Sequence, residues 1–308
     1  MSMIQHAVHR VTPQSGRPSE DFVARLDHLG TLRFGGEDAE VFLQGQLSCD
    51  VAEVSPRSST YGAYCSAKGR MLANFLLWRE ADGFAMALSR DLVAPVQKQI
   101  SRFVLRSRVK VSDTSESIAL VGAAGAQAER ALAGAFPDAD VSLRLRDGRL
   151  LLAPPAAEAA RILRELDLAD AGRWRWLDIR AGLPLITAAT QDQFVPQMAN
   201  LELIGGVSFE KGCYTGQEIV ARTQHLGRVK RRMFLANVPA SAQAGDALYS
   251  DDLGDQVGGT VLNAEASPEG GYDLLAVIQT ASRERSTVRL KARDGPALRF
   301  LPLPYAVT

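Results

Sequence analysis

Runs of apolar and polar residues predict a mixed set of strands and helices over the first two-thirds of the chain. Short apolar runs bounded by turn residues predict strands at 31–34, 71–78, 83–89 and 117–122. Apolar residues at helical spacing predict helices at 37–47, 93–104, 126–136 and 156–169. Two of the strands pass through glycine into a helix, which could mark two related lobes. The pattern therefore predicts an α+β body, residues 21–228, made of two such lobes.

Side-chain placements follow from the same helical patterns. Val41 and Phe42 are expected to point inward from the first helix, and Asp91 is expected to cap the second. Trp174 and Trp176 are two residues apart, which places the indoles on different helical faces, in the core or along a cavity wall.

The pattern of predicted elements changes after Arg232. Short apolar runs predict strands at 233–238, 256–263, 272–279 and 286–292, separated by Gly, Asp, Pro and Ser. Because no helical pattern intervenes, we expect residues 229–308 to form an all-β module, a β-barrel.

Composition narrows the class of protein. The chain has 308 residues, of which 46% are hydrophobic, enough for several packed units. The 35 basic and 35 acidic residues give no net charge, which excludes a whole-molecule binder of polyanions. No apolar run approaches a membrane span, and residues 1–20 are polar, so we expect a flexible arm, no membrane contact and a cytoplasmic protein.

Three widely spaced cysteines, Cys49, Cys65 and Cys213, argue against a disulfide framework and suit a reducing compartment. Without paired CxxC spacing they also predict no resident metal site. Cys49 and Cys65 are expected to be packing residues. Cys213 lies in FEKGCYTGQEIVAR, residues 209–222, where two glycines allow sharp turns.

The surroundings of Cys213 favour a reactive thiol. Thr215, followed three residues later by Glu218, predicts an N-cap and a helix start. A helix start and a nearby Lys211 would both lower the pKa of the Cys213 thiol. The alternative is a structural turn that holds a buried, inert cysteine.

Basic residues are concentrated between 211 and 232, where six of them stand against one acidic residue, Glu218. This stretch is either a solvated linker or a site for an anion, such as the glutamate tail of a folate, a phosphate or an RNA. Arg222 is its first candidate contact after Lys211.

The segment KGCYTGQE matches, residue for residue, the signature of the YgfZ family of folate-binding proteins. Further segments resemble the same family: FLQGQLSCDV at 42–51, YCSAKGRM at 64–71, the stretch 193–222 and PLPY at 302–305. The resemblance covers nearly the whole chain, and a motif that combines Cys, Tyr, Gln and Glu is specific.

The resemblance implies a fold like that of T-protein, the folate-dependent aminomethyltransferase, with lobes and a β-barrel in a ring around a hole. The hole holds tetrahydrofolate or a derivative. It also implies a role in synthesis or repair of iron–sulfur clusters, with tRNA methylthiotransferases as partners, and no settled reaction. Cys213 would be the functional thiol, in the catalytic position and as a transient iron–sulfur ligand. The remaining motif residues are Lys211, Gly212, Tyr214, Thr215, Gly216, Gln217 and Glu218.

Two positions depart from the T-protein pattern. Ala73 and Asn74 occupy the places of an acidic pair, and an amide cannot act as a carboxylate base, so aminomethyl transfer is not expected. Arg180 replaces a glutamate that holds the pterin ring, and an arginine only donates hydrogen bonds. Asp178 or Gln193 could supply the missing acceptor, and the sequence does not decide between them.

Three hypotheses follow. The leading one is an accessory protein that binds tetrahydrofolate and uses Cys213 in iron–sulfur cluster maintenance. The second is a folate-dependent one-carbon transferase or demethylase. The third is an RNA-binding scaffold, which the basic stretch alone supports.

Overall fold

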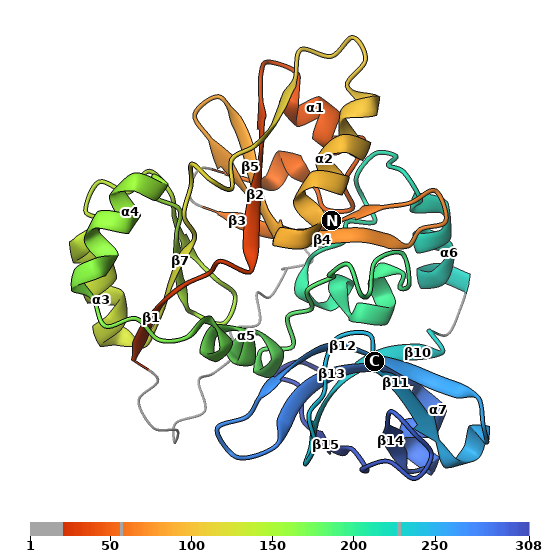
Figure 1. Cartoon of the computed structure of the whole chain (residues 1–308). Helices are drawn as coiled ribbons and strands as arrows, with labels where there is room; N and C mark the ends of the chain where they lie inside the picture. Colours follow the sequence, from red (N-terminus) through yellow and green to blue (C-terminus); the bar gives the residue numbers. More distant parts are fainter. Residues whose placement is uncertain (1–20, 56–57, 227–228, 308) are drawn as a thin grey trace, which may run out of the picture.

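The computed structural model describes residues 21–55, 58–226 and 229–307, so the predicted arm at 1–20 lies outside the described residues. Three β-sheets surround a central region (Figure 1): an upper sheet, a small sheet at the left and a C-terminal sheet below. This mixture of helices and sheets confirms the predicted fold class.

The upper sheet has five antiparallel strands in the order β3-β4-β5-β2-β6. Its strands are β2 (Leu29–Gly35), β3 (Ser59–Cys65), β4 (Met71–Glu80), β5 (Gly83–Ser89) and β6 (Lys110–Asp113). The hairpin predicted from the apolar runs is confirmed as β4 and β5. β4 is buried on both faces up to Trp78, which explains why its sequence is apolar there except at Asn74.

Helix α1 (Ala39–Gln44) lies on the upper sheet and corrects one expectation. Phe42 is buried as predicted, but Val41 is 78% exposed. Neighbouring helical residues point about 100° apart, so only one of the two can face the core squarely.

Helix α2 (Val93–Ile100) ends earlier than predicted and is not capped by Asp91. A 3₁₀ turn precedes the helix, and the Asp91 carboxylate accepts hydrogen bonds from Ser89 Oγ at 2.7 Å and from Ala188 N at 2.9 Å. Asp91 therefore ties this end of the sheet to a segment almost a hundred residues away.

The small sheet is antiparallel in the order β1-β7-β9-β8 and is accompanied by helices α3 and α4. Its elements are β1 (Phe22–Arg25), β7 (Val121–Ala124), α3 (Ala126–Ala135), β8 (Ser142–Arg144), β9 (Leu150–Leu152) and α4 (Ala156–Ile162). The predicted strand at 117–122 begins later, because the backbone amides of Ser117 and Ile118 turn back to Thr114 O.

The C-terminal sheet has six strands in the order β14-β11-β12-β13-β10-β15 and curls into a half-barrel. Its strands are β10 (Arg231–Val238), β11 (Ala247–Ser250), β12 (Val257–Ala266), β13 (Tyr272–Gln279), β14 (Val288–Leu290) and β15 (Arg299–Leu301). A bridge between Arg289 and Ala297 brings the chain before β15 against β14. Contrary to the expectation of no helix, α7 (Thr280–Arg285) follows β13, and its polar sequence carries no apolar periodicity.

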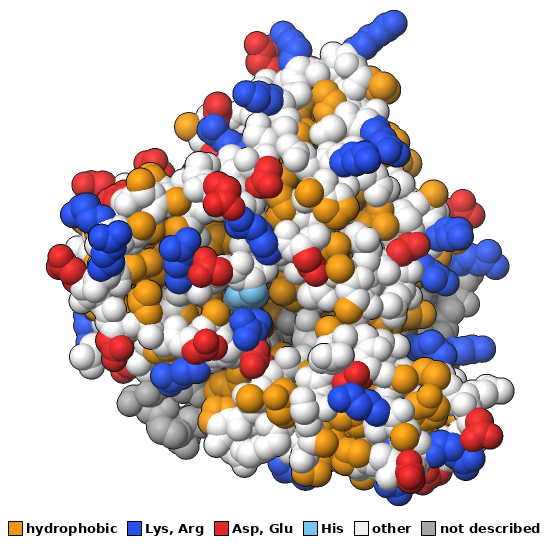
Figure 2. Space-filling view, viewed as in Figure 1, with side chains coloured by type: hydrophobic (Ala, Val, Ile, Leu, Met, Phe, Trp, Pro, Cys, Tyr) orange, Lys and Arg blue, Asp and Glu red, His pale blue; other side chains and the backbone are white. Residues whose placement is uncertain are grey.

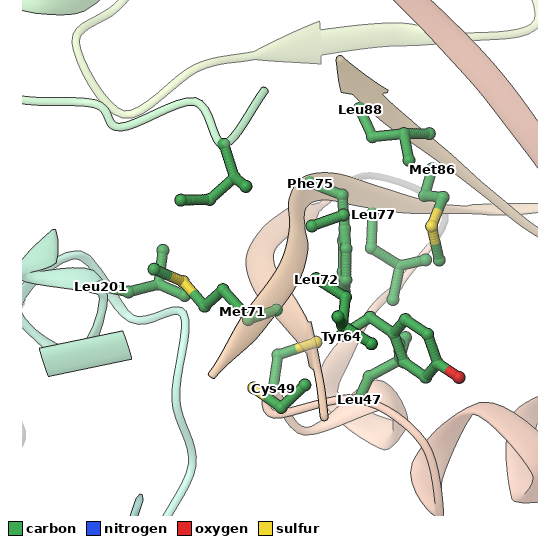
Figure 3. Packing of buried hydrophobic residues seen from close by; sticks show 14 of the residues in the cluster. Leu47, Cys49, Tyr64, Met71, Leu72, Phe75, Leu77, Met86, Leu88 and Leu201 are labelled. Atoms are coloured by element: carbon green, nitrogen blue, oxygen red, sulfur yellow. The ribbon is translucent and has the colours of Figure 1, made fainter. Parts of the chain in front are cut away.

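Helices α5 (Ala171–Arg180) and α6 (Gln217–Leu226), with two 3₁₀ turns at Pro196–Ala199 and Leu201–Ile204, connect the sheets. One apolar core cluster includes residues of the upper sheet, of this connection and of β10, β12 and β13. Figure 3 shows Met71 of β4 against Leu201 of the second 3₁₀ turn. Because this core crosses residue 228, the division at that point stays a prediction.

Candidate functional site

A cavity lies where the upper sheet, the small sheet and α5 meet. It has a volume of about 70 Å³ and mostly apolar walls, to which Leu26, Leu145 and Trp174 contribute. An adjoining cavity of about 200 Å³ shares Asp178 with it and reaches Asn263 on β12 of the C-terminal sheet. Residues of all three sheets line this pair of adjoining cavities, which we call the central cavity.

Asp178 is the acidic residue that lines both parts of the central cavity. Arg149, only 5% exposed, donates from Nη2 to Asp178 Oδ1 at 2.5 Å and from Nε to Asp147 Oδ2 at 2.6 Å. Its guanidinium also lies over Trp174, 4.0 Å from the ring centroid. Burial raises the pKa of Asp178 to about 6, with Arg149 opposing the shift. At neutral pH the carboxylate is therefore ionised and can accept hydrogen bonds.

Two neutral polar side chains from β3 and β4 also line the cavity. Asn74 donates from Nδ2 to Pro184 O at 2.7 Å, and its Oδ1 accepts from Ile186 N at 2.7 Å. Its amide is thus committed to the backbone that follows α5. Burial and the nearby Asp178 raise the pKa of Tyr61 well above its ordinary value, so its hydroxyl stays protonated.

The structure separates the other candidate folate contacts from the central cavity. Arg180 does not line either part; its Nη1 lies 3.4 Å from Asp273 Oδ2 on β13. Positions 178 and 180 are about 200° apart around α5, which puts them on opposite faces. Gln193 is exposed and donates from Nε2 to Ala189 O at 2.9 Å.

Lys211 anchors the start of the Cys213 loop, residues 211–216, from within the protein. Its ammonium is buried and donates to Leu47 O at 2.7 Å and to Cys49 O at 2.8 Å. It also lies 5.3 Å from the ring centroid of Tyr214, which is itself buried. These contacts engage the ammonium with backbone carbonyls, so the expectation that Lys211 activates the thiol of Cys213 loses its basis.

The two glycines of the loop are not equivalent. Gly216 has a φ of +82°, and a Cβ there would lie 2.4 Å from Ser66 O in the turn before β4. Gly212 has open space around it and no positive φ. Because α6 begins at Gln217, Gly216 and not Thr215 directly precedes the helix, a correction to the expected N-cap.

The three cysteines fall into two environments. Cys49 and Cys65 are buried, and burial raises the pKa of each thiol to about 12. Figure 3 shows Cys49 among the apolar side chains of the upper sheet, with Leu47 and Tyr64 nearby. Cys213 is exposed, four residues before α6 begins. This exposure contradicts the alternative of a buried cysteine at position 213.

Over the described residues, the basic stretch is divided between buried and exposed side chains. Lys211 is buried, and Arg232 is buried with Nη1 donating to Gln197 O at 2.9 Å and paired with Glu202. Arg222 is exposed on α6, while Arg228 lies outside the described residues. In the view of Figure 2, acidic and basic side chains intermingle over the small sheet and its helices.

Sequence reasoning missed several polar residues in and beside the central cavity, including His28, Thr187 and Arg149. His28, between β1 and β2, lines the larger part together with Asp178. His28 lies in a turn and Arg149 directly follows one, so no local signal marked either residue. The helical period of α5, by contrast, could have placed Asp178 and Trp174 on one face.

The described ranges contain neither a cluster of metal-ligating side chains nor a membrane-spanning helix. No group of three or more His, Cys, Asp or Glu residues there could hold a metal ion. No described helix combines the length and apolar character needed to cross a membrane.

Comparisons with known proteins agree with this architecture. The model of the GCVT N-terminal domain family matches residues 23–146. The solved structure of glycine cleavage system aminomethyltransferase T from Bartonella henselae matches with a TM-score of 0.73 over 93% of this chain and 86% of that chain. At 18% identity, this likeness shows the fold alone.

A curated relative gives the family. The tRNA-modifying protein YgfZ of Edwardsiella ictaluri (strain 93-146) is 34% identical, and the alignment covers 92% of this chain and 92% of that protein. With the motif KGCYTGQE at residues 211–218, this similarity over 92% of each chain shows that the chain belongs to the YgfZ family.

Proposed function

We propose that this protein binds tetrahydrofolate or a derivative in the central cavity and supports tRNA modification through the thiol of Cys213. The relative from Edwardsiella ictaluri is named a tRNA-modifying protein, and the fold is that of an aminomethyltransferase. The finer proposal is that Cys213 serves in synthesis or repair of iron–sulfur clusters for partners such as tRNA methylthiotransferases.

The observation that carries the proposal is the pairing of a cavity lined by all three sheets with a single exposed thiol. Of the three cysteines, only Cys213 reaches solvent. The buried Lys211 holds the start of the Cys213 loop in place, and Gly216 packs its end closely against the turn before β4. Such a loop presents the thiol without burying it, which suits thiol exchange or transient binding of cluster iron.

The residues of the central cavity fit a folate. Apolar walls, including Trp174 and Leu145, suit a flat heterocycle, and Asp178 supplies an acceptor for ring amino and N–H groups. Tyr61 adds a protonated hydroxyl. A bound reduced folate would supply a one-carbon carrier, and these residues would bind and orient its ring.

Aminomethyl transfer is not part of the proposal. That reaction was expected to need a carboxylate at the position of Ala73 or Asn74, and the Asn74 amide is engaged with Pro184 and Ile186. The free thiols favour a reducing compartment, and we place the protein in the cytoplasm on that ground.

Calorimetric titration with tetrahydrofolate tests the folate half of the proposal. We expect saturable binding by the unaltered protein and by Cys213→Ser, because the loop does not line the cavity. At a hundredfold excess over the dissociation constant, the ligand should stabilise both by about 2.7 kcal/mol. No heat and no thermal shift at millimolar ligand would refute folate binding.

A further inference from the structure

A groove of about 890 Å³ lies between the end of α6, the start of β10 and α7. Figure 1 shows these three elements on the right of the molecule, away from the small sheet. No described residue lines both this groove and the central cavity, so the two are separate sites. We call it the α7 groove, and its charged lining residues are Lys230, Arg232, Arg283, Glu284 and Arg285.

Arg283 is held in place by two aromatic rings. Its guanidinium carbon lies 4.7 Å from the ring centroid of Phe234 and 5.6 Å from that of Phe300. The two rings pack edge to face, with their centroids 6.2 Å apart. No described residue forms an ion pair or a hydrogen bond with this guanidinium. The N–H groups, which lie in the guanidinium plane, are therefore available to an anion.

Lys230 and Arg285 add two exposed cations that no described carboxylate pairs with. The carbonyl oxygen of Lys230 accepts from Thr280 N at 3.0 Å, which fixes the backbone of Lys230 beside the start of α7. Among the described residues, Glu284 is the one carboxylate that lines the groove. Three unpaired cations against one carboxylate leave the wall with an excess of two positive charges.

The other polar groups of the wall are hydrogen-bonding side chains or are already neutralised. Thr280 Oγ1 is buried and has no hydrogen-bond partner among the described residues. Gln224 of α6 and Gln279 of β13 add side-chain amides. Arg232 is paired with Glu202 and serves the fold. The groove thus combines free cations with neutral donors that come from several elements.

We propose that the α7 groove binds the phosphodiester backbone of a single nucleic-acid strand. Interfaces with nucleic acids are more polar and more positively charged than interfaces between proteins, whose centres are depleted of charge. A guanidinium on a rigid support, such as Arg283, matches phosphate oxygens through parallel hydrogen bonds. Lys230 on the other side of the groove contacts a neighbouring phosphate as a point charge.

The bound strand lies close to the Cys213 loop. Helix α6 begins four residues after Cys213, and Thr223 and Gln224 near its other end line the groove. A helix of 10 residues is about 15 Å long. The inference depends neither on folate binding nor on thiol chemistry, and it adds a nucleic-acid contact one helix length from the exposed thiol.

Fluorescence anisotropy of labelled oligo(U) and oligo(dT) strands of about twelve nucleotides tests the inference. At about 0.1 M KCl, the double variant Lys230→Gln with Arg285→Gln should bind about tenfold more weakly than the unaltered protein. The slope of log K against log[KCl] should fall by about 0.7 for each cation lost. The control, Arg130→Gln with Arg161→Gln, removes two exposed cations from α3 and α4 and should bind like the unaltered protein.

Competition experiments decide which anion the groove prefers. The strand that binds more tightly, oligo(U) or oligo(dT), identifies RNA or DNA as the source of the backbone. The inference is wrong if neither strand binds, or if the control pair weakens binding as much as the groove pair. It is also wrong if oligoglutamate of equal charge, or inorganic phosphate, displaces the label at lower concentration than unlabelled strand does. Calorimetric titration with tetrahydrofolate should give the same affinity in all variants, so failure here leaves the proposed function intact.

Discussion

The central cavity and the Cys213 loop are each supported by a buried cation, and the two cations have different partners. Arg149 donates to two carboxylates, and one of them, Asp178, lines the cavity. Lys211 donates to two backbone carbonyls, those of Leu47 and Cys49. The first arrangement holds an acceptor in place for a ligand. The second fixes a loop against the upper sheet.

The two regions differ in whether their buried polar atoms can still bind a ligand. In the central cavity His28, Thr187 and Asp178 keep unused hydrogen-bonding atoms among the described residues. In the loop the buried Lys211 serves structure, and the side chain presented to solvent is the thiol of Cys213. Binding is therefore expected from the cavity, and reactivity from the loop.

Removal of the Arg149 cation should give the largest effect. Arg149→Met leaves Asp147 and Asp178 without their counter-charge and is expected to lower the free energy of unfolding by about 3–5 kcal/mol. Arg144→Met, which breaks the more exposed pair with Glu129, should cost at most about 1 kcal/mol. Urea unfolding measures both. Equal losses would show that Arg149 is not a buried structural cation.

The two glycines of the loop allow a matched pair of substitutions. Gly216→Ala forces a side chain into a left-handed conformation and against Ser66 O, so we expect a loss of about 2–4 kcal/mol in unfolding free energy. Gly212→Ala meets open space and should change stability by less than about 0.5 kcal/mol. A comparable loss in both variants would contradict the geometry given for the loop.

Sequence patterns predicted the helices, the strands and the exposed Cys213 loop better than the hydrogen-bond partners of individual side chains. The motif pointed to glycine geometry, which holds for Gly216, but it assigned Lys211 to the thiol. The carbonyls that Lys211 binds lie over 160 residues away in sequence, and no local pattern encodes such a contact. The same limit applies to His28, which only the folded chain brings to Asp178.

His28 should make stability depend on pH in a direction that can be checked. Burial lowers its pKa in the folded chain to about 4, below the ordinary 6.5, so its contribution is complete above pH 6.5 and is lost as the pH falls toward 4. His28→Phe should remove this loss, which amounts to at most about 3 kcal/mol. Asp178 acts oppositely: with a pKa raised to about 6, its contribution is present at low pH and is lost as the pH rises through 6.

Urea unfolding at pH 4.5 and pH 7 measures the difference. His225→Gln, at the exposed histidine of α6, is the control and should leave the difference between the two pH values unchanged. If His28→Phe keeps the full acid sensitivity of the unaltered protein, His28 is not the source of the loss of stability at low pH.

The smallest effect on stability is expected at the thiol itself. Cys213→Ser alters an exposed side chain and should cost less than about 1 kcal/mol. In the unaltered protein, Cys213 should be alkylated before Cys49 and Cys65, whose thiols are buried with pKa values of about 12. Peptide mapping after brief alkylation gives the order, and earlier labelling of Cys49 or Cys65 would contradict it.

Rescue of tRNA methylthiolation in cells that lack the native gene tests the central claim most directly. Cells would carry the unaltered protein, Cys213→Ser or, as control, Glu210→Ala at an exposed position just outside the motif. We predict normal methylthiolation with the unaltered protein and the control, and none with Cys213→Ser, although that variant keeps its melting temperature and its affinity for tetrahydrofolate. Full rescue by Cys213→Ser would contradict the account, because it would leave the thiol without a function.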